Sequence, residues 1–214
     1  QVEHTVTEQV TGVDLVATQL ALARGATLAD VGLADAVPEP RGFAVQVRIN
    51  TEQMKADGST LPKGGTLAAF EPPTGAGLRT DTHGYAGYAP PPAFDSLLAK
   101  LIAHTPSGDY AAALARTRRG LAEFRIEGVP TNAAFLWALL GDEDVVANRV
   151  TTRLVEERAG ALLERAADMP MRWVTADAPA APKPDATTRV DSTDSLAVLS
   201  PGRAQTAVVP APMQ

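Results

Sequence analysis

The residues that could carry chemistry are few and lie far apart in this chain of 214 residues. Glu3 and His4 are adjacent, so on a strand their side chains would face opposite sides, which disfavours a two-residue acid–base pair. His83 and His104 have no partner at the spacing of a metal site, and this favours surface or core histidines. Residues 74–77 lack the Lys and Ser/Thr that complete a phosphate-binding loop, which indicates a turn.

Arg48 is a candidate for holding an anion. Residues 43–50 alternate strictly between apolar and polar types, which predicts a strand that packs on one face and presents Gln46, Arg48 and Asn50 on the other. A solvated arginine on an exposed strand face is the more common case for this pattern. Asp95 precedes an apolar stretch, so it is either a cap or loop aspartate or a buried carboxylate that orients a cation such as Arg48.

The elements that must position these residues begin with a helical stripe. Apolar residues recur at helical spacing from Val6 to Leu20, interrupted at Gly12. We therefore expect a short turn and then a helix over about 13–24, with Thr11 and Asp14 as a capping pair and Gly25 after its last turn. Residues 1–4 could be the end of a strand.

The rest of the pattern predicts an α+β fold with a small antiparallel sheet. Residues 96–104 fit a helical face and a buried strand equally well, and periodicity alone does not decide. The other expected elements are strands over 66–71 and 78–82, a helix over 110–124 capped by Asp109, an extended link over 125–129, a helix capped by Thr131 that runs to Leu140 and stops at Gly141, and a helix over 154–166.

Composition excludes several classes of protein. The 19 Lys and Arg against 25 Asp and Glu give a net charge of −6 without a basic run, so a nucleic-acid partner is not expected. The longest apolar run, Ala133–Leu140, is too short to span a bilayer. The absence of cysteine excludes disulfides and Cys-ligated zinc and is compatible with a reducing cytoplasm. We expect a soluble, cytoplasmic protein.

The C-terminal region has a different composition. It contains no aromatic residue after Trp173 and is rich in Ala and Pro, which predicts a flexible, disordered linker. The chain also begins at Gln1, with no initiator Met or targeting pattern. We therefore expect it to be a piece of a longer polypeptide.

Five segments of the chain form a distinctive ordered set. They are QVEHTVTEQVTGVDLVATQLALARG at 1–25, GFAVQVRINTE at 42–52, GYAGY at 84–88, FDSLLAKLIAH at 94–104 and ALARTRRGLAEFRIEGVPTNAAFL at 113–136. In this order they resemble segments of the biotin carboxylases, over about Gln1 to Ala166. The end of the chain, VVPAPMQ at 208–214, is similar to the first strand of a biotinyl carrier domain.

The resemblance implies a domain organisation. Residues 1–37 would be the end of an ATP-grasp region, 38–167 a biotin carboxylase C-terminal domain, 168–204 the flexible linker and 205–214 the start of a biotinyl carrier domain. It also implies that residues 96–104 form a strand.

The resemblance further implies an activity and its residues. Biotin carboxylases use MgATP to convert bicarbonate to carboxyphosphate, which yields CO2 for attack by N1′ of carrier-bound biotin. Glu3 matches the general base that deprotonates bicarbonate, and Gln1 and Val2 match positions that hold bicarbonate. Arg48 matches the arginine that stabilises the biotin enolate, and Asp95 would orient it at the biotin site.

The implied cofactors are ATP, Mg²⁺ or Mn²⁺, and biotin on a carrier domain. Most of their ligands would lie outside this chain, with no metal ligand inside it, so the fragment alone is expected to be inactive. The implied partners are a biotinyl carrier domain and a carboxyltransferase on the same polypeptide, and bicarbonate. The resemblance is also compatible with a homo-oligomer. However, Ala76 stands where some bacterial biotin carboxylases have a bulky aromatic residue in their dimer interface.

Two other functions stay open. One is another ATP-grasp ligase, and the other is a non-catalytic docking or dimerisation module. Within the biotin carboxylase interpretation, the sequence does not choose among acetyl-CoA, propionyl-CoA, a longer acyl-CoA and pyruvate as the final acceptor.

Overall fold

The computed structural model describes residues 4–36, 38–91, 95–107 and 109–173. The chain divides into two compact units, Gln1–Trp173 and Val174–Gln214, and all described residues belong to the first. The predicted carrier-domain strand and most of the predicted linker lie outside the described residues, as do Gln1, Val2 and Glu3. The predicted domain boundaries stay predictions.

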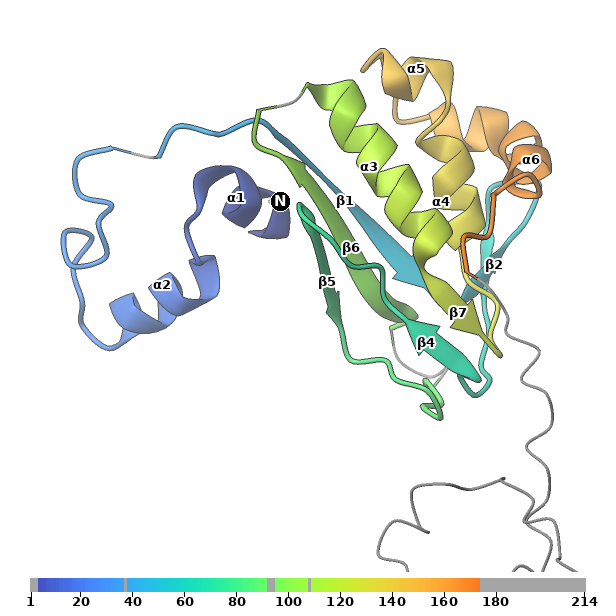
Figure 1. Cartoon of the computed structure of the whole chain (residues 1–214), viewed down its shortest axis with the longest axis horizontal. Coiled ribbons are helices and arrows are strands. Elements are labelled where there is room, and N and C mark those ends of the chain that lie inside the picture. The colour runs from blue at the N-terminus through green and yellow to red at the C-terminus, as the bar shows by residue number, and fades with distance from the viewer. Residues whose placement is uncertain (1–3, 37, 92–94, 108, 174–214) are drawn as a thin grey trace, which may run out of the picture. The chain divides into compact units, whose positions relative to one another are not determined.

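Helices and small antiparallel sheets make up the first unit, in agreement with the predicted mixed α+β class (Figure 1). The elements are α1 (His4–Thr11), α2 (Leu15–Ala23), β1 (Phe43–Asn50), β2 (Glu52–Met54), β3 (Thr60–Pro62), β4 (Ala69–Glu71), β5 (Leu78–Thr82), β6 (Leu97–Thr105), α3 (Tyr110–Glu123), β7 (Arg125–Glu127), α4 (Ala133–Leu139), α5 (Glu143–Val146) and α6 (Leu154–Ala166).

The main sheet has the strand order β1-β6-β5, and both pairings are antiparallel. Strand β6 is central, and six of its nine residues are buried. That burial explains why periodicity could not distinguish it from a helix, since a strand covered on both faces loses its alternation. The strand that the resemblance implied at residues 96–104 is confirmed. Strands β2 and β3 form a second sheet, and β4 and β7 a third.

Helix α3 covers one face of the main sheet. Asp109 caps it as predicted, accepting the backbone N–H of Ala112 at 2.8 Å. Its buried residues Leu114 and Leu121 join Leu101 of β6 in the main hydrophobic core. A second core cluster forms where α4 and α6 pack against each other.

Helix α1 contacts the main sheet at β1 and β6 (Figure 1). The hydroxyl of Thr5 donates a hydrogen bond to the side-chain carbonyl of Gln46. Gln46 belongs to the polar face of β1, whereas Val47 and Ile49 on the other face lie in the core beneath α3. Helices α1 and α3 therefore cover opposite faces of the sheet.

The helix expected over about 13–24 is confirmed as α2, and the chain turns at Gly12 as expected, with φ +75°. Two other predictions for the N-terminal region are wrong. His4 begins α1 instead of ending a strand, and Thr11 and Asp14 do not form a capping pair. Asp14 alone caps α2, accepting the N–H of Ala17 at 2.8 Å, whereas Thr11 accepts from Val13 at 3.3 Å in a local turn.

The short elements were predicted least well. Strand β4 covers only residues 69–71 of the expected 66–71, and its partner β7 lies in the segment expected to be a short extended link. Strands β2 and β3 and helix α5 were not predicted. Helix α4 has Asn132 and not Thr131 at its N-cap position, although Thr131 Oγ1 accepts the N–H of Ala133 at 3.4 Å.

Asp142 lies at the start of α5, and its ion pair with Arg158 is expected to stabilise the folded chain. Burial opposes ionisation of its carboxyl, but the Arg158 guanidinium at 2.8 Å and the N–H of Asp144 outweigh it, so its pKa lies below the usual value. Asp142→Asn keeps the helix cap and removes the charge. We expect it to lower the free energy of unfolding by about 1 kcal/mol at pH 7.

The expected loss depends on pH with a definite sign. A carboxyl whose pKa is depressed by folding stabilises the protein above its unfolded value of about 3.9, and this contribution disappears as the pH falls through the lower folded value. Urea unfolding from pH 7 to pH 3 should therefore show the Asp142→Asn difference shrinking as the pH falls. A difference that stays constant would contradict the charge-based explanation.

Candidate functional site

Arg48 lies at the end of β1, on the polar face of the main sheet. Its side chain is 45% exposed, and its Nη2 donates to the carboxylate of Asp95. Its Nε donates to Oδ1 of Asn50 at 3.0 Å. Among the described residues no partner contacts Nη1. Two acceptors thus fix one edge of the guanidinium and leave the other edge available for an anionic ligand.

The Arg48–Asp95 contact joins residues that are 47 positions apart in the chain. The Asp95 side chain is 64% exposed, so the expectation of a buried carboxylate is wrong. The pKa of the Asp95 carboxyl is lowered by the hydrogen bond from Arg48 and further by the backbone N–H of Leu97 at 3.0 Å. Asp95 is therefore a carboxylate at neutral pH. If Asp95 orients the guanidinium of Arg48, the two side chains must be in contact, and they are. The orienting role itself stays a prediction.

Helix α1 covers the same face of the sheet that carries Arg48. It is held there by the Thr5–Gln46 hydrogen bond and by Arg79 of β5, whose Nη1 donates to Glu8 at 2.6 Å. The helix begins at His4, which directly follows the predicted Glu3. The predicted roles of Gln1, Val2 and Glu3 stay predictions.

A largely buried polar network, which the sequence did not indicate, is hydrogen-bonded to Arg48. It consists of Asn50, Glu52 and Asn132, of which Glu52 and Asn132 are each 7% exposed. Asn132 is 80 positions from Glu52, so no local spacing links them. The only sequence signal was the presence of polar residues at the boundaries of apolar elements.

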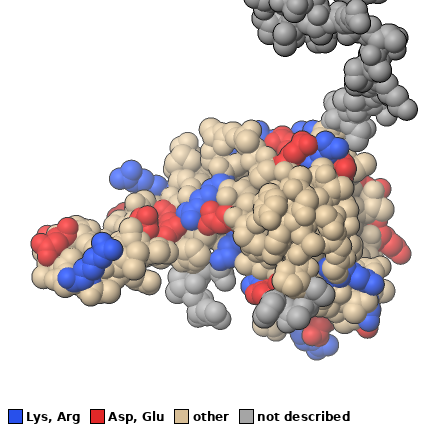
Figure 2. Space-filling view, turned by 90° about the horizontal axis from the view of Figure 1, so that it is seen from below, with Lys and Arg blue, Asp and Glu red and all other residues tan. Residues whose placement is uncertain are grey.

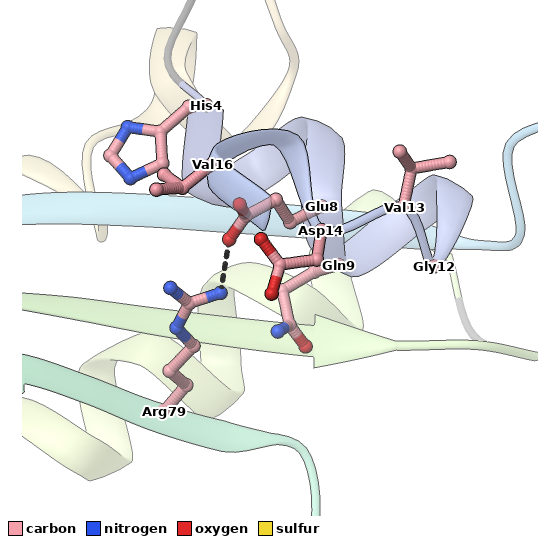
Figure 3. Close-up of a pocket in the computed structure, with 8 residues that line it drawn as sticks. All are labelled: His4, Glu8, Gln9, Gly12, Val13, Asp14, Val16 and Arg79. Carbon is pink, nitrogen blue, oxygen red and sulfur yellow. Dashed lines mark hydrogen bonds and ion pairs between the residues drawn. The ribbon is translucent and has the colours of Figure 1, made fainter. Parts of the chain in front are cut away.

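A polar pocket of about 440 Å³ lies beside α1 (Figure 3). Among the described residues that line it, Arg79 is the one lysine or arginine, and both of its sides are already occupied, by Asp81 at 2.7 and 2.8 Å and by Glu8. These carboxylates raise the pKa of Arg79 further. Within the described lining, no lysine or arginine is therefore left for an anionic substrate. Its lining consists of His4, Glu8, Gln9, Gly12, Val13, Asp14, Val16 and Arg79.

The histidines have local structural contacts. The ring of His83 lies edge-on to Tyr88 with centroids 5.5 Å apart, and Nε2 of His104 hydrogen-bonds to the carbonyl of Arg41 at 2.8 Å. The described residues contain no cluster of three or more His, Cys, Asp or Glu able to hold a metal.

Charges of both signs are mixed on the surface. Acidic and basic side chains lie next to one another on the face drawn in Figure 2. No helix in the described part of the chain has the length and apolar character needed to cross a bilayer.

Two family models match the chain. The model of the biotin carboxylase C-terminal domain matches residues 46–157, which include Arg48, Asp95 and the buried polar network. The model of the ATP-binding domain of the carbamoyl-phosphate synthase L chain matches residues 1–31, a range that includes α1 and α2.

Relatives and solved structures agree with these matches. Human mitochondrial pyruvate carboxylase is 40% identical over 158 residues, covering 73% of this chain and 13% of the relative. A single-chain, multi-domain long-chain acyl-CoA carboxylase is 45% identical with a TM-score of 0.70, over 78% of this chain and 18% of that one. A third match is the biotin carboxylase domain of Hydrogenobacter thermophilus 2-oxoglutarate carboxylase, solved in complex with MgADP and bicarbonate. It is 34% identical with a TM-score of 0.67, over 76% of this chain and 34% of that one. The chain spans about a third or less of these proteins.

Proposed function

Since the chain belongs to the biotin carboxylase family, we propose that it contributes the biotin side of a biotin carboxylase active site. The enzyme would be an ATP-dependent ligase that carboxylates carrier-bound biotin with bicarbonate. The observation that carries this proposal is the guanidinium of Arg48, held on one edge by Asp95 and Asn50 and accessible on the other.

The position of Arg48 suits the charge that develops in this reaction. Biotin becomes a nucleophile at N1′ by accumulating negative charge on its ureido oxygen. A cation that is already fixed in place stabilises such charge without reorganising during the reaction. Asp95 and Asn50 hold Arg48 in one orientation, so that its free N–H groups point in a defined direction.

The N-terminal segment has the residues for the bicarbonate side. Glu3 would take the proton of bicarbonate while the bicarbonate oxygen attacks the γ-phosphate of ATP, and Gln1 and Val2 would hold the anion. Helix α1 begins directly after these residues and packs on the face that carries Arg48. This contact supports placing both halves of the reaction at one site.

We assign residues 1–37 to the end of an ATP-grasp region. None of the nine residues of α2 is buried, and Val16 and Leu20 are 55% and 56% exposed. A helix this apolar is normally covered by a neighbouring element. The remainder of an ATP-binding domain, which would hold ATP and Mg²⁺ or Mn²⁺, suits this surface.

The remaining assignments complete the carboxylase. Residues 168–204 would be a linker that lets a biotinyl carrier domain, beginning at 205–214, move between this site and a carboxyltransferase on the same polypeptide. The acceptor would be an acyl-CoA or pyruvate, and the enzyme would work in the cytoplasm.

The test uses the complete polypeptide that contains this chain. With ATP, Mg²⁺, bicarbonate and free biotin, we expect carboxybiotin to form with stoichiometric release of ADP and phosphate. Omitting bicarbonate should abolish both products. If labelled bicarbonate gives no labelled biotin under conditions in which ATP is consumed, the protein is a different ATP-dependent ligase.

A further inference from the structure

A chain of polar side chains leads from the interior to Arg48. Oε1 of Glu52 accepts Nδ2–H of Asn50 at 3.2 Å, and Oδ1 of Asn50 accepts Nε–H of Arg48 at 3.0 Å. Glu52 is 7% exposed, whereas the side chain of Arg48 is 45% exposed. A buried carboxylate is therefore connected to the exposed cation through one amide.

The direction of these hydrogen bonds fixes the amide of Asn50. The guanidinium of Arg48 can only donate and Oε1 of Glu52 accepts, so Asn50 presents its oxygen to Arg48 and its NH2 group to Glu52. Without Glu52 the amide could turn by half a rotation and present its NH2 group to the N–H of Arg48, which would place two donors face to face. Glu52 thereby decides whether Arg48 has an acceptor at Nε.

Asn132 holds the same segment from the start of α4. Its Oδ1 accepts the backbone N–H of Asn50 at 2.9 Å, and its Nδ2 donates to the carbonyl of Arg48 at 3.2 Å and to Glu52 at 3.0 Å. Its side chain makes no cap bond to α4. It pairs with the backbone of β1 at a register irregularity between Ile49 and Asn50.

The backbone around Glu52 is also fixed by hydrogen bonds to neighbouring segments. Glu52 is paired with Pro62 in the β2–β3 sheet. The N–H of the preceding Thr51 donates to the carbonyl of Ser96 at 2.8 Å, and Ser96 follows Asp95. The two acceptors of Arg48 thus lie on segments that are bonded to each other.

We propose that Glu52 is a positioning residue, which holds the guanidinium of Arg48 in its productive orientation through Asn50. This inference rests on the proposed function of Arg48. It assigns to Glu52 no contact with substrate, only control of the direction in which the free N–H groups of Arg48 point.

The kinetic test compares Glu52→Ala and Glu52→Gln in the complete polypeptide. For Glu52→Ala we expect kcat for biotin carboxylation to fall about 10- to 100-fold, while ATP cleavage without biotin is unchanged. Glu52→Gln keeps a carbonyl oxygen for both amide donors, so it should stay within about threefold of the wild type. Wild-type kcat in Glu52→Ala would overturn the proposal, and so would an equal loss of both activities.

A control separates positioning from general destabilisation. Asp142→Asn also removes a buried carboxylate, but at α5 and outside this network. It should leave the ratio of biotin-dependent to biotin-independent ATP cleavage unchanged. If Asp142→Asn changed this ratio as much as Glu52→Ala does, the effect would be structural and the proposal would be wrong.

A spectroscopic arm is independent of the proposed function. In ¹⁵N NMR spectra of the 214-residue chain, the Nε–H signal of Arg48 should be sharp and slowly exchanging in the wild type and in Glu52→Gln. It should broaden or vanish in Glu52→Ala, while backbone signals of α3 persist. An unchanged Nε–H signal in Glu52→Ala would overturn the positioning role, whereas absence of carboxybiotin in the wild type would count against the proposed function alone.

Discussion

Replacing Arg48 with alanine in the complete polypeptide is expected to lower kcat for biotin carboxylation by about 100-fold or more. The reason is that the fixed positive charge next to the developing negative charge is lost. Arg48 has no proposed contact with ATP or bicarbonate, so ATP cleavage in the absence of biotin should persist. Measuring both rates on the same preparation separates the two effects.

Two further variants sharpen this result. Arg48→Lys keeps the charge, but a single ammonium lacks the planar arrangement of donors that serves both Asp95 and Asn50, so we expect an intermediate rate. Arg149→Ala removes an exposed arginine that also pairs with an aspartate, Asp144 at 2.8 Å, and should have no effect on the biotin rate. Wild-type carboxylation by Arg48→Ala would refute the site.

The second large effect concerns stability. Gly128→Ala is expected to lower the free energy of unfolding by about 3 kcal/mol and the Tm by about 10 °C. Gly128 has φ +94°, and a Cβ there would overlap the carbonyl oxygen of Thr66 and lie 2.7 Å from the amide nitrogen of Ala68. Both neighbours are backbone atoms next to the β4–β7 pairing, so they cannot move aside without breaking it.

Gly160→Ala is the matched control. Gly160 lies inside α6, and a Cβ there would meet no atom within 4 Å. The same substitution should therefore stabilise the protein by about 0.5 to 1 kcal/mol, through helix propensity. Thermal unfolding of both variants measures the difference, and equal Tm values would contradict the argument from backbone geometry.

The long elements could be predicted because their signals are local. The alternation in β1, the Asp109 cap of α3 and the apolar spacing of α6 each lie within one segment. Strand β6 could not be recognised from periodicity, because its neighbours bury both of its faces. The three-residue strands β2, β3 and β4 have too few residues to show a period.

The site was predictable only in part, for a related reason. The direction of Arg48 follows from alternation, and its pairing with Asp95 follows from the family resemblance. The contributions of Glu52 and Asn132 depend on contacts between β2, β1 and α4, which exist only in the folded chain. A polar residue at the boundary of an element looks the same whether it is solvated or buried in a network.

The side chain of Asn132 has a consequence for the dynamics of β1. The end of a strand normally frays, and its last amides exchange with solvent through small local openings. Here the amide proton of Asn50 is held by a side chain 82 positions away, itself anchored at the start of α4. Releasing that proton requires breaking this long-range bond, in which the side chain of Asn132 also holds the carbonyl of Arg48 and Glu52. We therefore expect the Asn50 amide to exchange more slowly than the last amide of a strand that ends in solvent.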